Sequence, residues 1–167
     1  GMFGGRAWFH LQQKPDGSIA YDEAGAWRAV EMLEAFVNRW LEANEMGGTP
    51  VIVAGFSQGA MMSHALLHRG NVPVRAVLGL SGRSVAPDSP GASAPSWMDG
   101  VPVFVSHGVH DPIIPIENAR AVRDYYAGTG VELTYNEYDM AHEVNAACLE
   151  DARSWAAGVI ERTPASR

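Results

Sequence analysis

The residues in this sequence whose types and spacing suit chemistry are a serine, an aspartate and a histidine. The serine, Ser57, is the centre of a Gly-x-Ser-x-Gly pentapeptide at 55–59, directly after the apolar run 51–54 and directly before a helix-like stretch. A serine on such a strand-to-helix turn presents its hydroxyl above a sheet, and the flanking glycines are needed because Cβ atoms there would collide with neighbouring backbone. The pattern therefore predicts a nucleophile at Ser57.

A serine hydroxyl is a poor nucleophile at neutral pH, so this prediction requires a base and a group that orients the base. Asp111 follows the apolar segment 101–106, and His142 follows 131–138, where apolar and polar residues alternate as in a half-buried strand. The order Ser, Asp, His at the ends of successive strands is that of a catalytic triad built on this kind of turn. We expect all three side chains at one edge of a parallel sheet.

Each of these residues also has a plainer interpretation. Ser57 could be an ordinary helix N-cap, Asp111 could form an Asx turn before the next proline, and His142 could be a surface histidine. His107 and His110 lie near Asp111, and together with His142 they could be drawn as a metal site. Their spacing matches no metal motif, so we expect a structural His107, an exposed His110, and neither a metal nor another cofactor.

Three segments occur in a fixed order: Gly-Phe-Ser-Gln-Gly at 55–59, His-Gly-Val-His-Asp-Pro-Ile-Ile-Pro at 107–115 and Met-Ala-His-Glu at 140–143. Together they resemble the phospholipase/carboxylesterase family of α/β hydrolases, which includes acyl-protein thioesterases and bacterial carboxylesterases. The likeness extends from about Arg6 to the last predicted helix. It implies an α/β-hydrolase-like, mostly parallel sheet with helices on both faces, in an N-terminally truncated or minimal version.

The resemblance also implies roles for individual residues. Ser57 would be the nucleophile, His142 the general base and acid, and Asp111 the residue that holds His142 in the right tautomer. The backbone amide of Gln58 would donate a hydrogen bond to the oxyanion. Four other residues are expected either to line an acyl pocket or to be plain packing: Trp8, Phe9, Trp97 and Met98.

The rest of the chain alternates predicted strands and helices, as in βαβ units with a parallel sheet. With 167 residues, 47% of them hydrophobic, we expect a single α/β domain over 1–167. A further short apolar strand is predicted at 74–80. Helices are predicted at 22–45, 58–69, 115–127 and 143–161, and residues 83–100 form one long irregular segment that is expected to overhang the site.

Members of the family begin with a strand that ends in a His-Gly-x-Gly type loop, whose amide is a second oxyanion donor. That strand, a helix and a further strand do not precede residue 1 in this sequence. Without a neighbour on that side, the strand at 51–54 would have an exposed apolar edge, which favours pairing with another chain. We therefore expect either a piece of a longer protein or a homodimer that covers this edge.

Composition narrows the classes of partner. The formal net charge of −7 and the lack of a Lys/Arg cluster argue against a nucleic-acid partner. Apolar runs stay shorter than a membrane span, so we expect no stable membrane insertion. The one cysteine, Cys148, cannot form an internal disulfide, and we expect a buried structural thiol in a cytoplasmic protein.

These observations predict a serine hydrolase that cleaves carboxylic esters or thioesters through an acyl-enzyme on Ser57. Two alternatives stay open. One is a catalytically impaired hydrolase-like module for binding or assembly, because the usual second oxyanion donor loop is absent. The other is a hydrolase of related fold that acts on carbon–carbon or lactone bonds.

Overall fold

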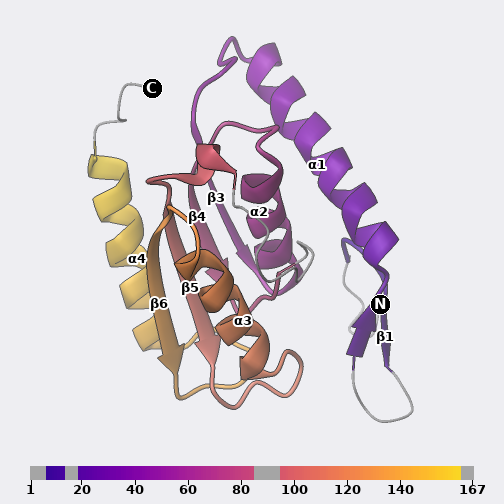
Figure 1. Ribbon diagram of the computed structural model, residues 1–167, viewed down its shortest axis with the longest axis vertical. Coiled ribbons are helices and arrows are strands. Elements are labelled where there is room, and N and C mark those ends of the chain that lie inside the picture. The colour runs from indigo at the N-terminus through magenta and orange to yellow at the C-terminus, as the bar shows by residue number, and fades with distance from the viewer. Residues whose placement is uncertain (1–6, 14–18, 85–94, 163–167) are drawn as a thin grey trace.

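Four parallel strands form the central sheet of the computed structural model, which describes residues 7–13, 19–84 and 95–162 (Figure 1). The strands lie side by side in chain order: β3 (Val51–Phe56), β4 (Val74–Leu80), β5 (Pro102–Gly108) and β6 (Glu132–Tyr138). Because each strand pairs in parallel with the next, all four carboxyl ends meet at one edge of the sheet. At this edge the sequence predicts the chemistry.

Helices cover both faces of the sheet, which confirms the predicted fold class. They are α1 (Glu23–Ala43), α2 (Gln58–Arg69), α3 (Ile116–Ala127) and α4 (Ala146–Glu161). Alternate strand residues point to opposite faces. Val77 and Val103 belong to the core shared with α1, α2 and α3, whereas Leu78 and Phe104 pack on the α4 side, where the rings of Phe104 and Trp155 lie 5.6 Å apart. The result is a three-layer arrangement (Figure 1).

Local capping explains where the helices begin and end. The Asp22 carboxylate accepts a hydrogen bond from the Gly25 amide at 2.9 Å and caps α1. Helix α2 ends at Gly70, which has the left-handed φ of 69° that glycine adopts without strain. The side chain of Asn145 caps α4 by accepting from the Cys148 amide at 2.9 Å. This cap makes α4 begin at Ala146, later than the predicted start at 143, and leaves the histidine loop outside the helix.

A small antiparallel hairpin precedes α1, and the sequence analysis did not predict it. Its strands are β1 (Leu11–Gln13) and β2 (Ile19–Tyr21). Strands of three residues are too short to display the alternation by which a strand is recognised. The hairpin lies near the N-terminal end of α1 (Figure 1), and the Asp22 amide donates to the His10 carbonyl at 3.1 Å.

The two edges of the central sheet differ in chemistry. Among the described residues β3 pairs only with β4, and its side chains Ile52 and Phe56 are 36% and 40% exposed. On the opposite edge, Glu137 of β6 pairs with Arg120 at 2.9 Å, and the Tyr138 hydroxyl donates to Asp151 at 2.7 Å. The edge at β3 is thus apolar, while the edge at β6 carries charged and hydrogen-bonding side chains.

Helix α1 adds to the apolar surface. Three large side chains at intervals of four residues, and therefore on one face of the helix, are half exposed or more: Met32, Phe36 and Trp40. Within the part of the chain that the structure describes, every helix is too short or too polar to cross a lipid bilayer.

Candidate active site

Ser57 lies on a tight turn between β3 and α2, as the sequence predicts. Its φ of 54° and ψ of −118° are unusual for a residue with a side chain. The Ser57 amide donates to the Leu80 carbonyl at 2.8 Å, which ties the turn to the end of β4. A Cβ on Gly55 would overlap the backbone of Gly59, so glycine is required there, but a Cβ on Gly59 would meet nothing within 4 Å. The expected steric need for glycine on both sides is therefore wrong for Gly59.

The structure brings Ser57, His142 and Asp111 into a hydrogen-bonded row. His142 Nε2 is 3.0 Å from Ser57 Oγ, and His142 Nδ1 is 2.7 Å from Asp111 Oδ2. A carboxylate only accepts, so Nδ1 carries the hydrogen and Nε2 is left to accept from the serine hydroxyl. The ring centroids of His142 and Phe56 lie 4.8 Å apart, and the His142 side chain is 18% exposed. The imidazole of His142 is therefore oriented by Asp111 and partly accessible.

Four donors hold the Asp111 carboxylate. Its Oδ1 accepts from the Ile113 and Ile114 amides, both at 2.8 Å, while Oδ2 faces His142 and, at 3.2 Å, His107 Nε2. The hydrogen bonds from these two backbone amides form the Asx turn that was the plainer interpretation of Asp111. In this site the turn and the row coexist, because the two carboxylate oxygens serve different partners.

His107 is a second histidine in contact with the Asp111 carboxylate. Its ring is fully buried, and Nε2 lies 2.8 Å from the Ile114 carbonyl as well as 3.2 Å from the Asp111 carboxylate. Both neighbours are acceptors, so Nε2 carries the hydrogen, and Nδ1 is buried without a partner among the described residues. The sequence predicted only a structural His107; the spacing of four residues to Asp111 was the available signal. His110 is exposed and pairs with Asp139 at 2.9 Å.

On the other side of Ser57, Gln58 is the first residue of α2. Amides at this position have no partner within the helix and lie at its positive end, which suits an anion. The Gln58 side chain binds the N-terminal segment: Oε1 accepts from the Trp8 amide at 2.9 Å, and Nε2 donates to the Phe9 carbonyl at 3.0 Å. The Phe9 ring is buried against Tyr21, while Trp8 is 47% exposed. No motif in the sequence indicated this link.

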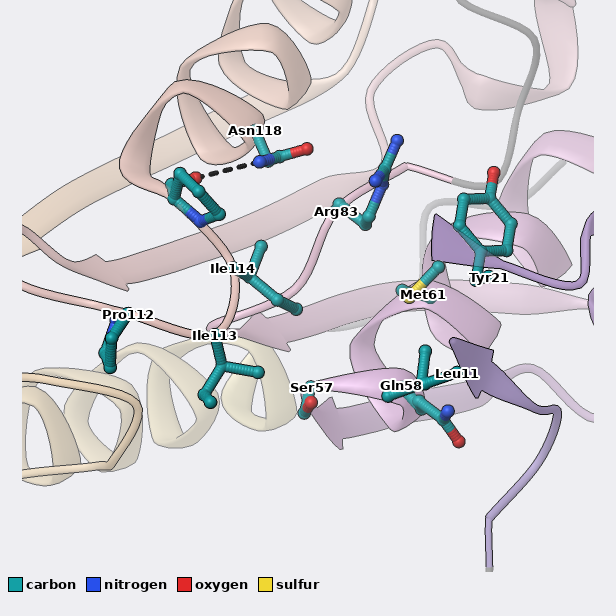
Figure 2. Close-up of a pocket in the computed structure, with 11 residues that line it drawn as sticks. Leu11, Tyr21, Ser57, Gln58, Met61, Arg83, Pro112, Ile113, Ile114 and Asn118 are labelled. Carbon is teal, nitrogen blue, oxygen red and sulfur yellow. Dashed lines mark hydrogen bonds between the residues drawn. The ribbon is translucent and has the colours of Figure 1, made fainter. Parts of the chain in front are cut away.

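A cavity of about 270 Å³ opens beside the row (Figure 2). The hairpin contributes Leu11 and Tyr21, the turn and α2 contribute Ser57, Gln58 and Met61, and the segment after β4 contributes Arg83. The loop after β5 and the start of α3 complete the wall with Pro112, Ile113, Ile114, Pro115 and Asn118. The wall is mostly apolar, which suits an acyl chain.

Trp97 and Met98 do not line this cavity. The Trp97 indole donates to the Leu67 carbonyl at 3.0 Å and packs over Gly70, at the C-terminal end of α2. Met98 is fully buried in the core. Ser57 is at the other end of a 12-residue helix, roughly 15 Å away along its axis. Of the two expectations for Trp97 and Met98, these contacts favour packing over an acyl pocket. The expected overhang of 83–100 concerns mainly 85–94, which lie outside the described residues.

Two buried groups near the centre stay outside the row. His64 of α2 lies 2.9 Å from the Tyr126 hydroxyl, and complete burial lowers the pKa of His64 to about 4. Its ring occupies the space that a Cβ on Gly79 of β4 would need. Cys148 is buried as predicted, and burial raises the pKa of its thiol. Both groups serve packing.

A parallel sheet with a serine on a strand-to-helix turn, and with Asp and His within hydrogen-bonding reach in later loops, is the arrangement of the α/β hydrolases. Within that class, the model of the phospholipase/carboxylesterase family matches residues 1–160, and the chain belongs to this family. The chain is thus, by class, a hydrolase of carboxylic esters or thioesters.

Individual relatives agree with this assignment. The chain is 25% identical to acyl-protein thioesterase 1 of Debaryomyces hansenii, with 93% of the chain and 68% of the relative covered. It is 27% identical to acyl-protein thioesterase 1 of Candida albicans, with 93% and 70% covered. Among solved structures, the fold is similar to a Bacillus cereus carboxylesterase (TM-score 0.72, 16% identity, 83% and 64% covered) and to Zea mays acyl-protein thioesterase 2 (TM-score 0.67, 18% identity, 95% and 76% covered). The chain spans about two thirds of the length of most of these proteins.

Proposed function

We propose that this chain hydrolyses carboxylic esters or thioesters through an acyl-enzyme, with Ser57 as nucleophile, His142 as base and Asp111 as the residue that orients the base. The observation that carries the proposal is the continuous row of two hydrogen bonds from Ser57 Oγ through His142 to Asp111, at 3.0 and 2.7 Å. The mostly apolar cavity beside Ser57 supports an acyl substrate.

In the first step, His142 Nε2 takes the proton of Ser57 as Oγ attacks the carbonyl carbon, and the Asp111 carboxylate stabilises the imidazolium that forms. The tetrahedral oxyanion accepts a hydrogen bond from the Gln58 amide at the start of α2. The imidazolium then gives its proton to the leaving alcohol or thiol. In the second step His142 activates water, which attacks the acyl-enzyme and releases the carboxylic acid and the free serine.

The test of this proposal is Ser57→Ala. Loss of the nucleophile should lower kcat for p-nitrophenyl acetate by about a million-fold and abolish labelling by a fluorophosphonate probe. Ser63→Ala is the matched control, because Ser63 is a second serine of α2, buried and bonded to the Gly59 carbonyl at 3.0 Å. Labelling that persists in a folded Ser57→Ala protein, or that disappears equally in Ser63→Ala, would reject the assignment.

A second candidate function is a catalytically impaired module that assembles through the edge of β3. The exposed apolar side chains of β3 and α1 favour it. We propose that such assembly takes the form of a homodimer that covers the edge of β3. We also propose that the protein is cytoplasmic. A wild-type protein that sediments as a dimer, becomes a monomer with Ile52→Lys and fails to react with the fluorophosphonate would support the module over the esterase.

A further inference from the structure

One charged side chain lines the cavity beside Ser57 and has no role in the steps above. Arg83 follows the end of β4 and is half buried. Its guanidinium carbon lies 4.9 Å from the ring centroid of Tyr21, which comes from the hairpin (Figure 2). Its Nε is buried and has no hydrogen-bond partner among the described residues.

Among the described residues, no carboxylate forms an ion pair with Arg83. An arginine keeps its charge at any physiological pH, and a half-buried arginine is normally paired with a carboxylate. None of the ion pairs within residues 7–13, 19–84 and 95–162 includes Arg83. Of the described residues that line the cavity, Arg83 alone carries a charge. A cation thus faces an otherwise apolar or uncharged wall, in a protein with an excess of acidic residues.

The contact with Tyr21 fixes the guanidinium without neutralising it. An aromatic ring attracts the face of a guanidinium and leaves the N–H groups at its edge free to donate. Two N–H groups at one edge match the two oxygens of a carboxylate or a phosphate. In the view of Figure 2, the apolar side chains of Met61 and Ile114 flank the space between Ser57 and Arg83, which suits a linking hydrocarbon segment.

We propose that the substrate of this site carries an anionic group, a carboxylate or a phosphate, that Arg83 binds while the ester or thioester carbonyl lies at Ser57. The substrate class is therefore an amphiphilic ester or thioester with a negative end, joined by an apolar segment to the bond that is cleaved. This inference rests on the proposed function of Ser57 and adds the substrate class to it.

The competing explanation is structural: Arg83 would only hold the hairpin to the sheet through Tyr21. The two explanations differ in what they predict for selectivity. A purely structural clamp affects charged and neutral substrates alike, because both need the same cavity wall. Loss of an anion-binding arginine affects the charged substrate more than the neutral one and raises the KM of the charged substrate.

The experiment compares pairs of esters that differ only in the charge. For a carboxylate the pair is mono-p-nitrophenyl adipate and p-nitrophenyl hexanoate; for a phosphate it is p-nitrophenyl 6-(phosphonooxy)hexanoate and p-nitrophenyl 6-hydroxyhexanoate. In the wild type, kcat/KM should favour the charged member of one pair. Arg83→Met, which keeps the bulk, should lower that preference by about 10- to 100-fold through KM, and Arg83→Lys should restore part of it.

Arg75→Met is the matched control, because Arg75 lies at the opposite end of β4 and donates to the Val159 carbonyl at 2.7 Å. It should leave the preference unchanged. A wild type without preference for the charged member of either pair, or an Arg83→Met protein of unchanged preference, overturns the proposal. Melting temperatures show whether each variant is folded.

A binding measurement separates this inference from the proposed function. Titration calorimetry of the Ser57→Ala protein with adipate and with glycerol 3-phosphate needs no turnover. If Ser57 proves unreactive but one of these anions binds and Arg83→Met abolishes the binding, the esterase proposal fails and the anion site stands. If the esters are hydrolysed but neither anion binds and no preference exists, the anion site fails and the esterase stands.

Discussion

The two sides of Ser57 are supported in different ways. On the acid–base side, Asp111 and His142 are held by hydrogen bonds among residues of the loops after β5 and β6. On the side of the expected oxyanion donor, the position of the Gln58 amide depends on the position of helix α2. It also depends on the N-terminal segment, because the Gln58 side chain bonds to the Phe9 carbonyl, 49 residues away in the chain.

This difference in support predicts how substitutions on each side of Ser57 should affect activity. The acid–base side is a local network, so a single substitution within it should change chemistry sharply. The oxyanion side is expected to use a backbone amide, which no substitution except proline removes, so other substitutions should weaken it only through the position of α2 or of the segment at Trp8 and Phe9.

The largest effect is expected from Asp111→Asn on the acid–base side. An amide at this place would favour the wrong tautomer of His142, and kcat should fall by about 10⁴-fold. The protein should also lose stability, because the buried carboxylate accepts from the Ile113 and Ile114 amides. Stopped-flow acylation and urea unfolding measure the two effects. An Asp111→Asn protein within tenfold of wild-type kcat would show that the network does not orient the base.

Acid should lower the stability of the folded protein through His64, which lies in helix α2. Its pKa is about 4 in the folded protein and 6.5 in an ordinary environment, so the unfolded chain binds more protons between these values. Stability is therefore fully present above pH 6.5 and is lost as pH falls toward 4, by roughly 3 kcal/mol in all.

Urea unfolding at pH 7 and pH 5 of the wild type and of His64→Gln checks this. The variant can still bond Tyr126 but does not titrate, so its stability should depend less on pH. The pKa of His68 is also lowered by burial, and His68 is present in both proteins, so the difference between them reports His64. Equal pH dependence in the two proteins would contradict the prediction.

A smaller effect is expected from His107→Phe. Without the Nε2 donor, Asp111 should shift enough to lower kcat by about 10²-fold while KM changes little. His107→Gln, which keeps a donor, should recover part of the loss. The control is His110→Phe, since His110 is exposed and pairs only with Asp139 among the described residues. A rise in KM with constant kcat would mean that His107 shapes the cavity instead of positioning Asp111.

The smallest effect is expected from Gln58→Ala. The backbone amide remains, so kcat/KM should fall only a few-fold, by about 1 kcal/mol of lost hydrogen bonding. The Trp8 amide loses its acceptor, and its hydrogen exchange should become faster. Asn38→Ala, which removes a side-chain bond to the Asn71 carbonyl elsewhere, is the control. Unchanged exchange at Trp8 would show that the segment is held by other contacts.

The strands, the helices and the turn at Ser57 could largely be predicted from the sequence, because the patterns that indicate them are local. Gly55 and Ser57 mark the turn through steric demands within five residues, and Gly70 marks the end of α2. Asp111 and His142 could be found because each follows a recognisable strand, and parallel strands bring their ends together. Their roles in catalysis are proposals that rest on this geometry.

The cavity could not be predicted in the same way. Tyr21, Met61, Arg83 and Ile114 come from four separate segments, and nothing within any one of them indicates the others. Trp97 was expected either to line an acyl pocket or to be plain packing. Its indole bonds to the last turn of α2, since closeness to a loop in sequence does not fix which end of a helix the loop reaches.

The free edge of β3 has a consequence for how this sheet can grow. At β6 the side chains of Glu137 and Tyr138 are already engaged with helices α3 and α4, whereas β4 is the only strand of the described residues that pairs with β3. β3 runs straight into Ser57. A strand that paired in parallel with β3 would therefore bring the loop at its own carboxyl end beside Ser57, so growth of the sheet at this edge would also change the surroundings of the serine.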